Sequence, residues 1–167
     1  MTEKVLVAGI GNIFLGDDGF GVEVVRRLAE RDLPPDVEVL DVGIRGLHLA
    51  YQLLDGYRAL VLVDAMARGG EPGALYVIEP DLDAFDQPAQ DQALLDAHSM
   101  DPETVLRSIT ALARETGGQR VGRVLVVGCE PATVEEWMGL SEPVSGAVDA
   151  AVDMVLDVVQ NELRVLT

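Results

Sequence analysis

The chain has 167 residues, of which 49% are hydrophobic and 25% are charged, as in ordinary globular proteins. Its 29 acidic against 12 basic side chains give a formal net charge of −17, which argues against nucleic acid and anionic membrane surfaces as partners. It has one cysteine, no signal-peptide pattern and no apolar run approaching the roughly 20 residues of a membrane span. We therefore expect one soluble, cytoplasmic domain over residues 1–167.

The first predicted unit is a strand, a glycine turn and a helix. Residues 5–8 are apolar without polar alternation, which is typical of a central strand covered on both faces. Gly9 and Gly11 then allow a tight turn. The helix that follows carries apolar side chains at helical spacing, namely Phe20, Val24, Val25 and Leu28.

The glycine turn also has the start of a dinucleotide-binding fingerprint, in which backbone amides and a helix N-terminus hold a pyrophosphate. Phe14 replaces the third glycine, and Asp17 and Asp18 stand where a phosphate would lie. Two carboxylates there repel an anion and attract a cation. A helix N-cap explains one acid, so we expect Asp17 to be the cap and Asp18 the functional carboxylate.

Two further apolar strands are predicted, and an acid ends each of them. Residues 37–41 end at Asp41, and residues 59–63 are followed by Asp64. In the alternative of a nucleotide-binding module, Asp41 would bind a ribose. Between the two strands, a glycine turn over residues 43–46 leads into a predicted helix with Leu47, Ala50, Tyr51 and Leu54, in which we expect His48 to be packed or solvated.

The second half continues the alternation. The link over residues 65–73 is too short for a crossover helix, so residues 74–78 are predicted to form an antiparallel edge strand. Residues 79–100 read as a long exposed loop that contains His98, and a helix is predicted to start at Asp101 and to end near Gly117 and Gly118. Residues 124–127 form the last predicted central strand. Ser145 is the predicted cap of a final helix, whose apolar positions are Val148, Val152, Val155 and Val159.

This order predicts a three-layer α/β/α fold with a mainly parallel five-stranded sheet and one antiparallel edge strand. In a doubly wound order of 2-1-3, a crevice opens where the first and third strands end, so Asp18 and Asp64 converge there. With His98 they form a two-carboxylate, one-imidazole set that suits a divalent transition metal. Two of these residues also have an explanation without a metal. The Asp64 carboxylate can accept hydrogen bonds from loop amides, and His98 can be an ordinary surface histidine.

Nucleophilic catalysis has little support in the sequence. There is no Gly-x-Ser-x-Gly motif. Cys129 follows a strand, but we expect it to be buried and inert, because the neighbouring Glu130 carboxylate would raise its pKa.

Several motifs in this order resemble those of the nickel-iron hydrogenase maturation endopeptidases. They are Gly-Ile-Gly-Asn-Ile-Phe-Leu-Gly-Asp-Asp-Gly-Phe-Gly at 9–21, Asp-Val-Gly-Ile-Arg-Gly at 41–46, Val-Asp-Ala at 63–65, His98, Gly-Cys-Glu-Pro at 128–131 and Gly-Leu-Ser at 139–141. The likeness spans nearly the whole chain. That family removes a short C-terminal extension from the hydrogenase large-subunit precursor once nickel has been inserted.

The resemblance implies that this chain is an endopeptidase of the same kind, in which Asp18, Asp64 and His98 contact Ni²⁺ and the two aspartates are catalytic. Many relatives carry glutamate in place of Asp18, so the ligand geometry here differs slightly. Gly43 and Gly46 fall in a loop associated with substrate recognition. We expect the precursor to present the nickel, rather than the enzyme to hold it permanently. A non-catalytic chaperone that only holds the precursor is the remaining alternative.

Overall fold

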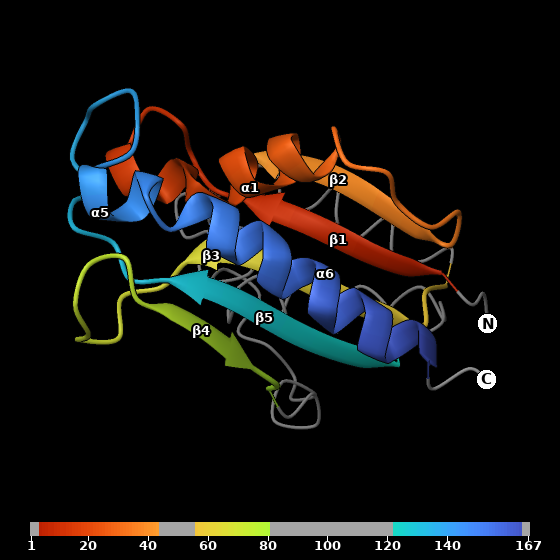
Figure 1. Cartoon of the computed structure of the whole chain (residues 1–167). Coiled ribbons are helices and arrows are strands. Elements are labelled where there is room, and N and C mark those ends of the chain that lie inside the picture. The colour runs from red at the N-terminus through yellow and green to blue at the C-terminus, as the bar shows by residue number, and fades with distance from the viewer. Residues whose placement is uncertain (1–3, 44–55, 81–121, 165–167) are drawn as a thin grey trace, which may run out of the picture.

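The computed structural model describes residues 4–43, 56–80 and 122–164 and shows one five-stranded sheet in the order β2-β1-β3-β5-β4 (Figure 1). The strands are β1 (Val5–Ile10), β2 (Val37–Gly43), β3 (Ala59–Ala65), β4 (Leu75–Ile78) and β5 (Arg123–Cys129). Neighbouring strands are parallel except for β4, which runs antiparallel to β5 at the edge. The predicted fold class, the 2-1-3 order and the antiparallel edge strand are confirmed.

The register aligns the carboxyl ends of the parallel strands at one edge of the sheet. Gly9 of β1 pairs with Asp41 of β2 on one side and with Val63 of β3 on the other. Asp64 in turn pairs with Gly128 of β5. Loops that leave β1, β3 and β5 therefore start close together, as expected at the switch point of a doubly wound sheet.

Helices α1 (Phe20–Leu28) and α6 (Val148–Arg164) cover one face of the sheet (Figure 1). The side chains predicted to face the core from both helices are at most 3% exposed: Phe20, Val24, Val25, Leu28, Val148, Val152, Val155 and Val159. They pack on alternate residues of the central strands, such as Val5, Val7 and Val61. Burial of these apolar side chains is the main stabilising contribution of this layer.

The opposite face of the same strands is buried as well. Its side chains form a second cluster with Tyr57 and Val42, made by Leu6, Ala8, Ile10, Leu60, Leu62, Val124 and Val126. Burial on both faces explains why the strands lack polar alternation. The predicted helix at 47–54 with His48, the predicted helix from Asp101 to near Gly117, and nearly all of the predicted loop at 79–100 lie outside the described residues. No helix in the described part of the chain is long and apolar enough to cross a membrane.

The start of the last helical region differs from the prediction. A short helix, α5 (Glu142–Ser145), precedes α6, and Ser145 is its last residue rather than the cap of α6. Ser141 precedes α5 instead, and Pro143 lies in the first turn. Proline is well tolerated there because its fixed φ suits a helix start, which moves the beginning of the helical region toward the N-terminus.

Candidate functional site

Close backbone packing holds the start of α1 against the carboxyl ends of β1 and β3. A Cβ atom on Gly21 would lie 2.1 Å from the Val63 carbonyl oxygen and 2.6 Å from that of Ile10. A Cβ atom on Gly9 would lie 2.3 Å from the Gly21 carbonyl oxygen. No side chain fits at either position. The short 3-10 helix η1 (Gly16–Gly19), which carries Asp18, is thereby held at the edge where Asp64 lies near the end of β3.

The same packing fills the turn that a dinucleotide would need. A Cβ atom on Gly11 would lie 1.8 Å from the Asp18 carbonyl oxygen, so the chain's own backbone closes over the glycines. A fingerprint glycine instead leaves room for a pyrophosphate to approach the backbone. Asp41 is exposed at the end of β2. This geometry argues against the nucleotide-binding alternative.

Asp18 is a partly buried carboxylate with one fixed oxygen. Its Oδ2 accepts a hydrogen bond from the Asn12 backbone N–H at 2.8 Å. Burial raises the pKa of Asp18 above its ordinary value of 3.8, and the Asn12 hydrogen bond offsets part of that increase. A nearby cation stabilises the ionised form of a partly buried carboxylate more than that of a fully solvated one.

Asp64 is the more deeply buried of the two acids, with 1% of its surface exposed. Its Oδ1 accepts the Ala65 N–H at 2.8 Å, a local contact of the kind the structural alternative for this residue foresaw. That contact also fixes the orientation of the carboxylate. A buried carboxylate at the end of an apolar strand is unfavourable unless polar or cationic partners compensate it.

Asp17 was predicted to cap the helix, and this prediction is wrong. Neither η1 nor α1 has a side-chain cap. Asp17 is fully buried and accepts four hydrogen bonds from one remote loop: Ala132 N at 2.7 Å, Thr133 N at 3.1 Å, Ser141 N at 2.7 Å and Ser141 Oγ at 2.8 Å. The 3-10 turn points its carboxylate away from the first turn of α1. Asp17 therefore joins η1 to the segment that follows β5.

Glu130 is a buried acid to which the sequence analysis assigned no role, although it stands in the Gly-Cys-Glu-Pro motif. Its Oε1 accepts the Arg68 N–H at 2.8 Å, the Gly70 N–H at 2.9 Å and the Tyr76 hydroxyl at 2.8 Å. These hydrogen bonds, with that of Arg68 the strongest, lower the pKa of Glu130 against the opposing effect of burial. Glu130 thus orders the link that leaves the site directly after Asp64.

Cys129 is buried, as predicted. Burial, with smaller contributions from the Asp17 and Glu130 carboxylates, raises the pKa of its thiol to about 11. At neutral pH almost none of the thiol is ionised, and the thiol form is a poor nucleophile. The predicted burial of Cys129 is confirmed, and the raised pKa supports the prediction that the thiol is inert.

The remaining predicted site residues are only partly placed. His98 and Gly46 lie outside the described residues, and Gly43 is the last residue of β2, beside Ile10 at a bulge. In the ranges that the structure describes, no three His, Cys, Asp or Glu side chains are grouped closely enough to hold a metal ion. Those ranges contribute Asp18 and Asp64 to the edge, and a third ligand would have to come from elsewhere.

A mainly parallel sheet of this order is the architecture of α/β proteins that bind their ligands in a crevice at the carboxyl ends of the strands, the edge at which Asp18 and Asp64 lie. The family model for hydrogenase maturation proteases matches residues 22–158. The chain is 37% identical over 153 residues to the hydrogenase expression/formation protein HupD of Rhodobacter capsulatus, covering 90% of this chain and 68% of HupD.

Solved structures agree with the sequence matches. The hydrogenase 2 maturation peptidase from Thaumarchaeota archaeon SCGC_AB-539-E09 superposes with a TM-score of 0.71 at 34% identity, over 95% of this chain and 99% of that one. The hydrogenase maturating endopeptidase HybD of E. coli gives a TM-score of 0.76 at 26% identity, over 95% and 93%. The chain belongs to the hydrogenase maturation protease family, and it is therefore an endopeptidase, a hydrolase of peptide bonds.

Proposed function

We propose that this protein removes the C-terminal extension of a nickel-iron hydrogenase large-subunit precursor after nickel insertion, and that it recognises the nickel through Asp18, Asp64 and His98. Membership of the maturation protease family supports the precursor as substrate. Gly43 and Gly46 are proposed to contact that substrate. A cytoplasmic location stays a prediction.

One observation carries the metal-recognition part of the proposal. The contact of Gly21 with the Val63 carbonyl oxygen packs the start of α1 on the end of β3, three residues after Asp18 and one before Asp64. Two acids that are 46 positions apart in the chain are thereby brought to one edge of the sheet. Burial of both carboxylates leaves them poorly solvated, and a divalent ion would compensate that loss.

The nickel in this scheme is part of the substrate. A backbone N–H helps to orient each carboxylate, that of Asn12 for Asp18 and that of Ala65 for Asp64, so little reordering of these two side chains is needed on binding. A buried carboxylate near a peptide bond can also act as general base toward water. Nickel can alternatively activate the water itself.

Substitution of the two acids tests the proposal. Asp18→Asn and Asp64→Asn each retain shape but lose a negative ligand, so we expect cleavage of a nickel-loaded precursor to fall at least a hundredfold, as seen by mass spectrometry of the precursor. Asp41→Asn is the matched control, because Asp41 is exposed at the same edge, and it should cleave normally.

Two measurements separate the parts of the proposal. Equal cleavage of nickel-loaded and nickel-free precursor would remove the role of the metal while leaving the peptidase intact. Unchanged cleavage by both aspartate variants would remove the site. A variant that still binds the nickel-loaded precursor with normal affinity but does not cut it would identify the carboxylate that acts as base.

A further inference from the structure

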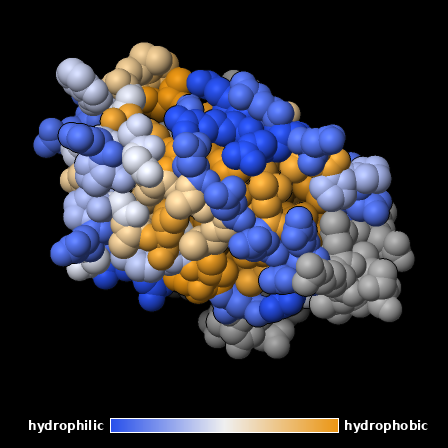
Figure 2. All heavy atoms as spheres, viewed as in Figure 1, coloured by the Kyte–Doolittle hydropathy of each residue, from blue (hydrophilic) through white to orange (hydrophobic). Residues whose placement is uncertain are grey.

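An exposed apolar surface lies beside the candidate site and has no part in it. Phe14, Trp137 and Met138 are 60%, 71% and 67% exposed, and we call these three side chains the apolar platform. They come from two loops, residues 12–16 and 131–140, that lie side by side at one end of the molecule (Figure 1). Figure 2, drawn in the same view, shows hydrophobic side chains in orange and tan next to hydrophilic ones in blue at that end of the molecule.

The two loops are fastened together through their backbones. The Trp137 N–H donates to the Phe14 carbonyl oxygen at 3.0 Å, and the Gly16 N–H donates to the Trp137 carbonyl oxygen at 2.8 Å. Asp17 adds four hydrogen bonds to the flanks of the second loop. The exposed side chains are therefore held outward by an ordered backbone, which is the preorganisation expected of a binding surface.

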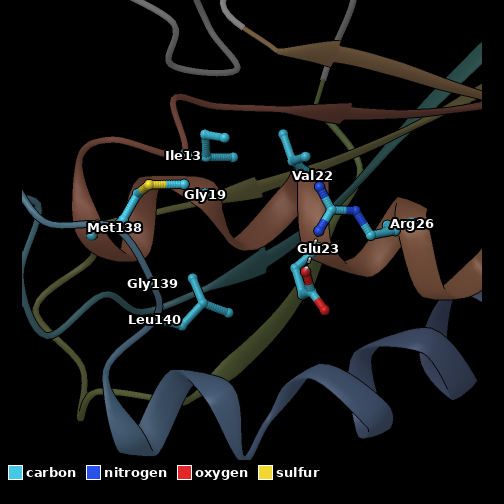
Figure 3. A pocket seen from close by; sticks show the side chains of 9 residues that line it. Ile13, Gly19, Val22, Glu23, Arg26, Met138, Gly139 and Leu140 are labelled. Atoms are coloured by element: carbon cyan, nitrogen blue, oxygen red, sulfur yellow. Dashed lines mark ion pairs between the residues drawn. The ribbon is translucent and has the colours of Figure 1, made fainter.

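A cavity of about 280 Å³ adjoins the platform at Met138 and lies between η1, α1 and residues 138–140. Met138, Ile13 and Leu140 line one part of it, and the Glu23–Arg26 ion pair lies at the other (Figure 3). Its size is just below the roughly 300–1,000 Å³ of small-molecule sites, so it suits one or two protein side chains. Gly16 and Gly19, which flank Asp17 and Asp18 in η1, also line it, so the cavity borders the short helix that carries Asp18.

The charge around the platform restricts what can bind there. Glu135 and Glu136 are exposed directly before Trp137, and residues 131–142 include three acids and no base. A second copy of this chain would bring its own net charge of −17 and would be repelled. A partner segment with an apolar side chain flanked by lysine or arginine is complementary both to the apolar surface and to its negative charge.

We propose that the apolar platform docks the precursor through such a segment, with an apolar side chain in the cavity and basic residues against Glu135 and Glu136. This docking role rests on the proposed function, since the precursor is the partner. Substrate binding would then be shared between the carboxylates, which contact the metal, and the platform, which contacts the polypeptide. The contacts of Asp17 join the two, since Asp17 fixes the loop of Trp137 beside Asp18.

Trp137 is the only tryptophan of the chain, which allows a direct test. Protein labelled with 5-fluorotryptophan gives a single ¹⁹F resonance from the platform. Nickel-free precursor, which the proposed function leaves uncleaved, should shift or broaden that resonance on binding, whereas dilution of the enzyme alone should leave it unchanged.

Kinetics with the nickel-loaded precursor give the second readout. Trp137→Ala should raise KM roughly tenfold or more and change kcat little, because buried tryptophans at interfaces contribute strongly to affinity. Val77→Ser, at an exposed apolar position on β4, is the matched control and should leave KM unchanged. Glu135→Lys with Glu136→Lys should lower kcat/KM at low salt, whereas Glu30→Lys with Asp36→Lys, between α1 and β2, should not.

The outcomes separate this proposal from the proposed function. A resonance shifted by nickel-free precursor, together with no cleavage of the nickel-loaded precursor, would support the platform and defeat the proposed function. Cleavage with an unmoved resonance and an unchanged KM for Trp137→Ala would overturn the platform. A resonance that moves with the concentration of the enzyme alone would assign the surface to a second copy and overturn it as well.

Discussion

At the scale of single residues, the two adjacent acids of η1, Asp17 and Asp18, have different roles. Asp17 is buried and satisfied by four hydrogen bonds, whereas Asp18 is only partly buried and has a raised pKa. The first arrangement stabilises the fold, and the second leaves a carboxylate that is poorly solvated while ionised. Stability and function are therefore divided between neighbours.

Asp17→Asn should lower the free energy of unfolding by about 2–4 kcal/mol, because hydrogen bonds to a charged acceptor are strong and the amide offers one oxygen instead of two. Urea denaturation measures the change. Ser141→Ala removes one of the four donors and should cost about 1 kcal/mol. An equal effect of the two substitutions would contradict the central position of Asp17.

Asp18→Asn should instead stabilise the protein at neutral pH. Because the folded protein raises the pKa of Asp18, the folded state holds the proton more tightly than the unfolded chain does. The free energy of unfolding of the wild type therefore falls as the pH rises from 3.8 through the folded pKa and is level above it.

Thermal unfolding across pH checks this effect. The variant should melt above the wild type at pH 7, and the difference should vanish as the pH approaches 3.8. Cleavage by the wild type should be lost on acidification at a pH above that value, since a protonated carboxylate does not bind a metal. A variant that melts below the wild type at pH 7 would mean that the charge of Asp18 is compensated in the folded protein.

At the scale of elements, the contact between α1 and the ends of β1 and β3 places the candidate site. Gly21→Ala would put a methyl group 2.1 Å from the Val63 carbonyl oxygen, so α1 must move away from β3. We expect a loss of about 1–3 kcal/mol in the free energy of unfolding. Cleavage should fall as well, because η1 and Asp18 move with α1.

Gly146→Ala is the matched control for that substitution. Gly146 has a φ of −69°, and a Cβ atom there would lie 3.4 Å from its nearest neighbour, the Glu142 carbonyl oxygen. Alanine should therefore be neutral or slightly stabilising, since it restricts the unfolded chain. Similar losses of stability and cleavage in the two variants would show that the contact of α1 with β3 has no special role.

At the scale of the whole molecule, the net charge of −17 should oppose the compact state. Sodium chloride screens this repulsion, because the Debye length falls from about 30 Å at 0.01 M to roughly 3 Å at 1 M. We expect the melting temperature to rise with salt. The surface ion pairs, such as Lys4–Glu38 and Arg27–Asp149, weaken at the same time but contribute about 1 kcal/mol or less each. A melting temperature that falls with salt would show that the pairs outweigh the repulsion.

The sequence by itself determined the architecture of this protein. Apolar strands without alternation require cover on both faces, and helical spacing of apolar residues supplies that cover; both are local patterns that can be read along the chain. The sheet order and the edge strand formed by Leu75–Ile78 followed from this reasoning, and η1, which carries Asp18, contacts β3, which carries Asp64. The motifs also led to the correct family.

Only the tertiary structure decided which acid does what and which surface is left exposed. Asp17 lies 124 positions from Ser141, and Glu130 lies 62 positions from Arg68, so no local pattern could reveal those hydrogen bonds. The apolar platform could not be predicted from the sequence either, because its three side chains lie in loops and follow neither helical nor strand spacing. The physical reason is that capping and helical spacing depend on neighbours in the chain, whereas satisfaction of a buried carboxylate and exposure of an apolar side chain depend on neighbours in space.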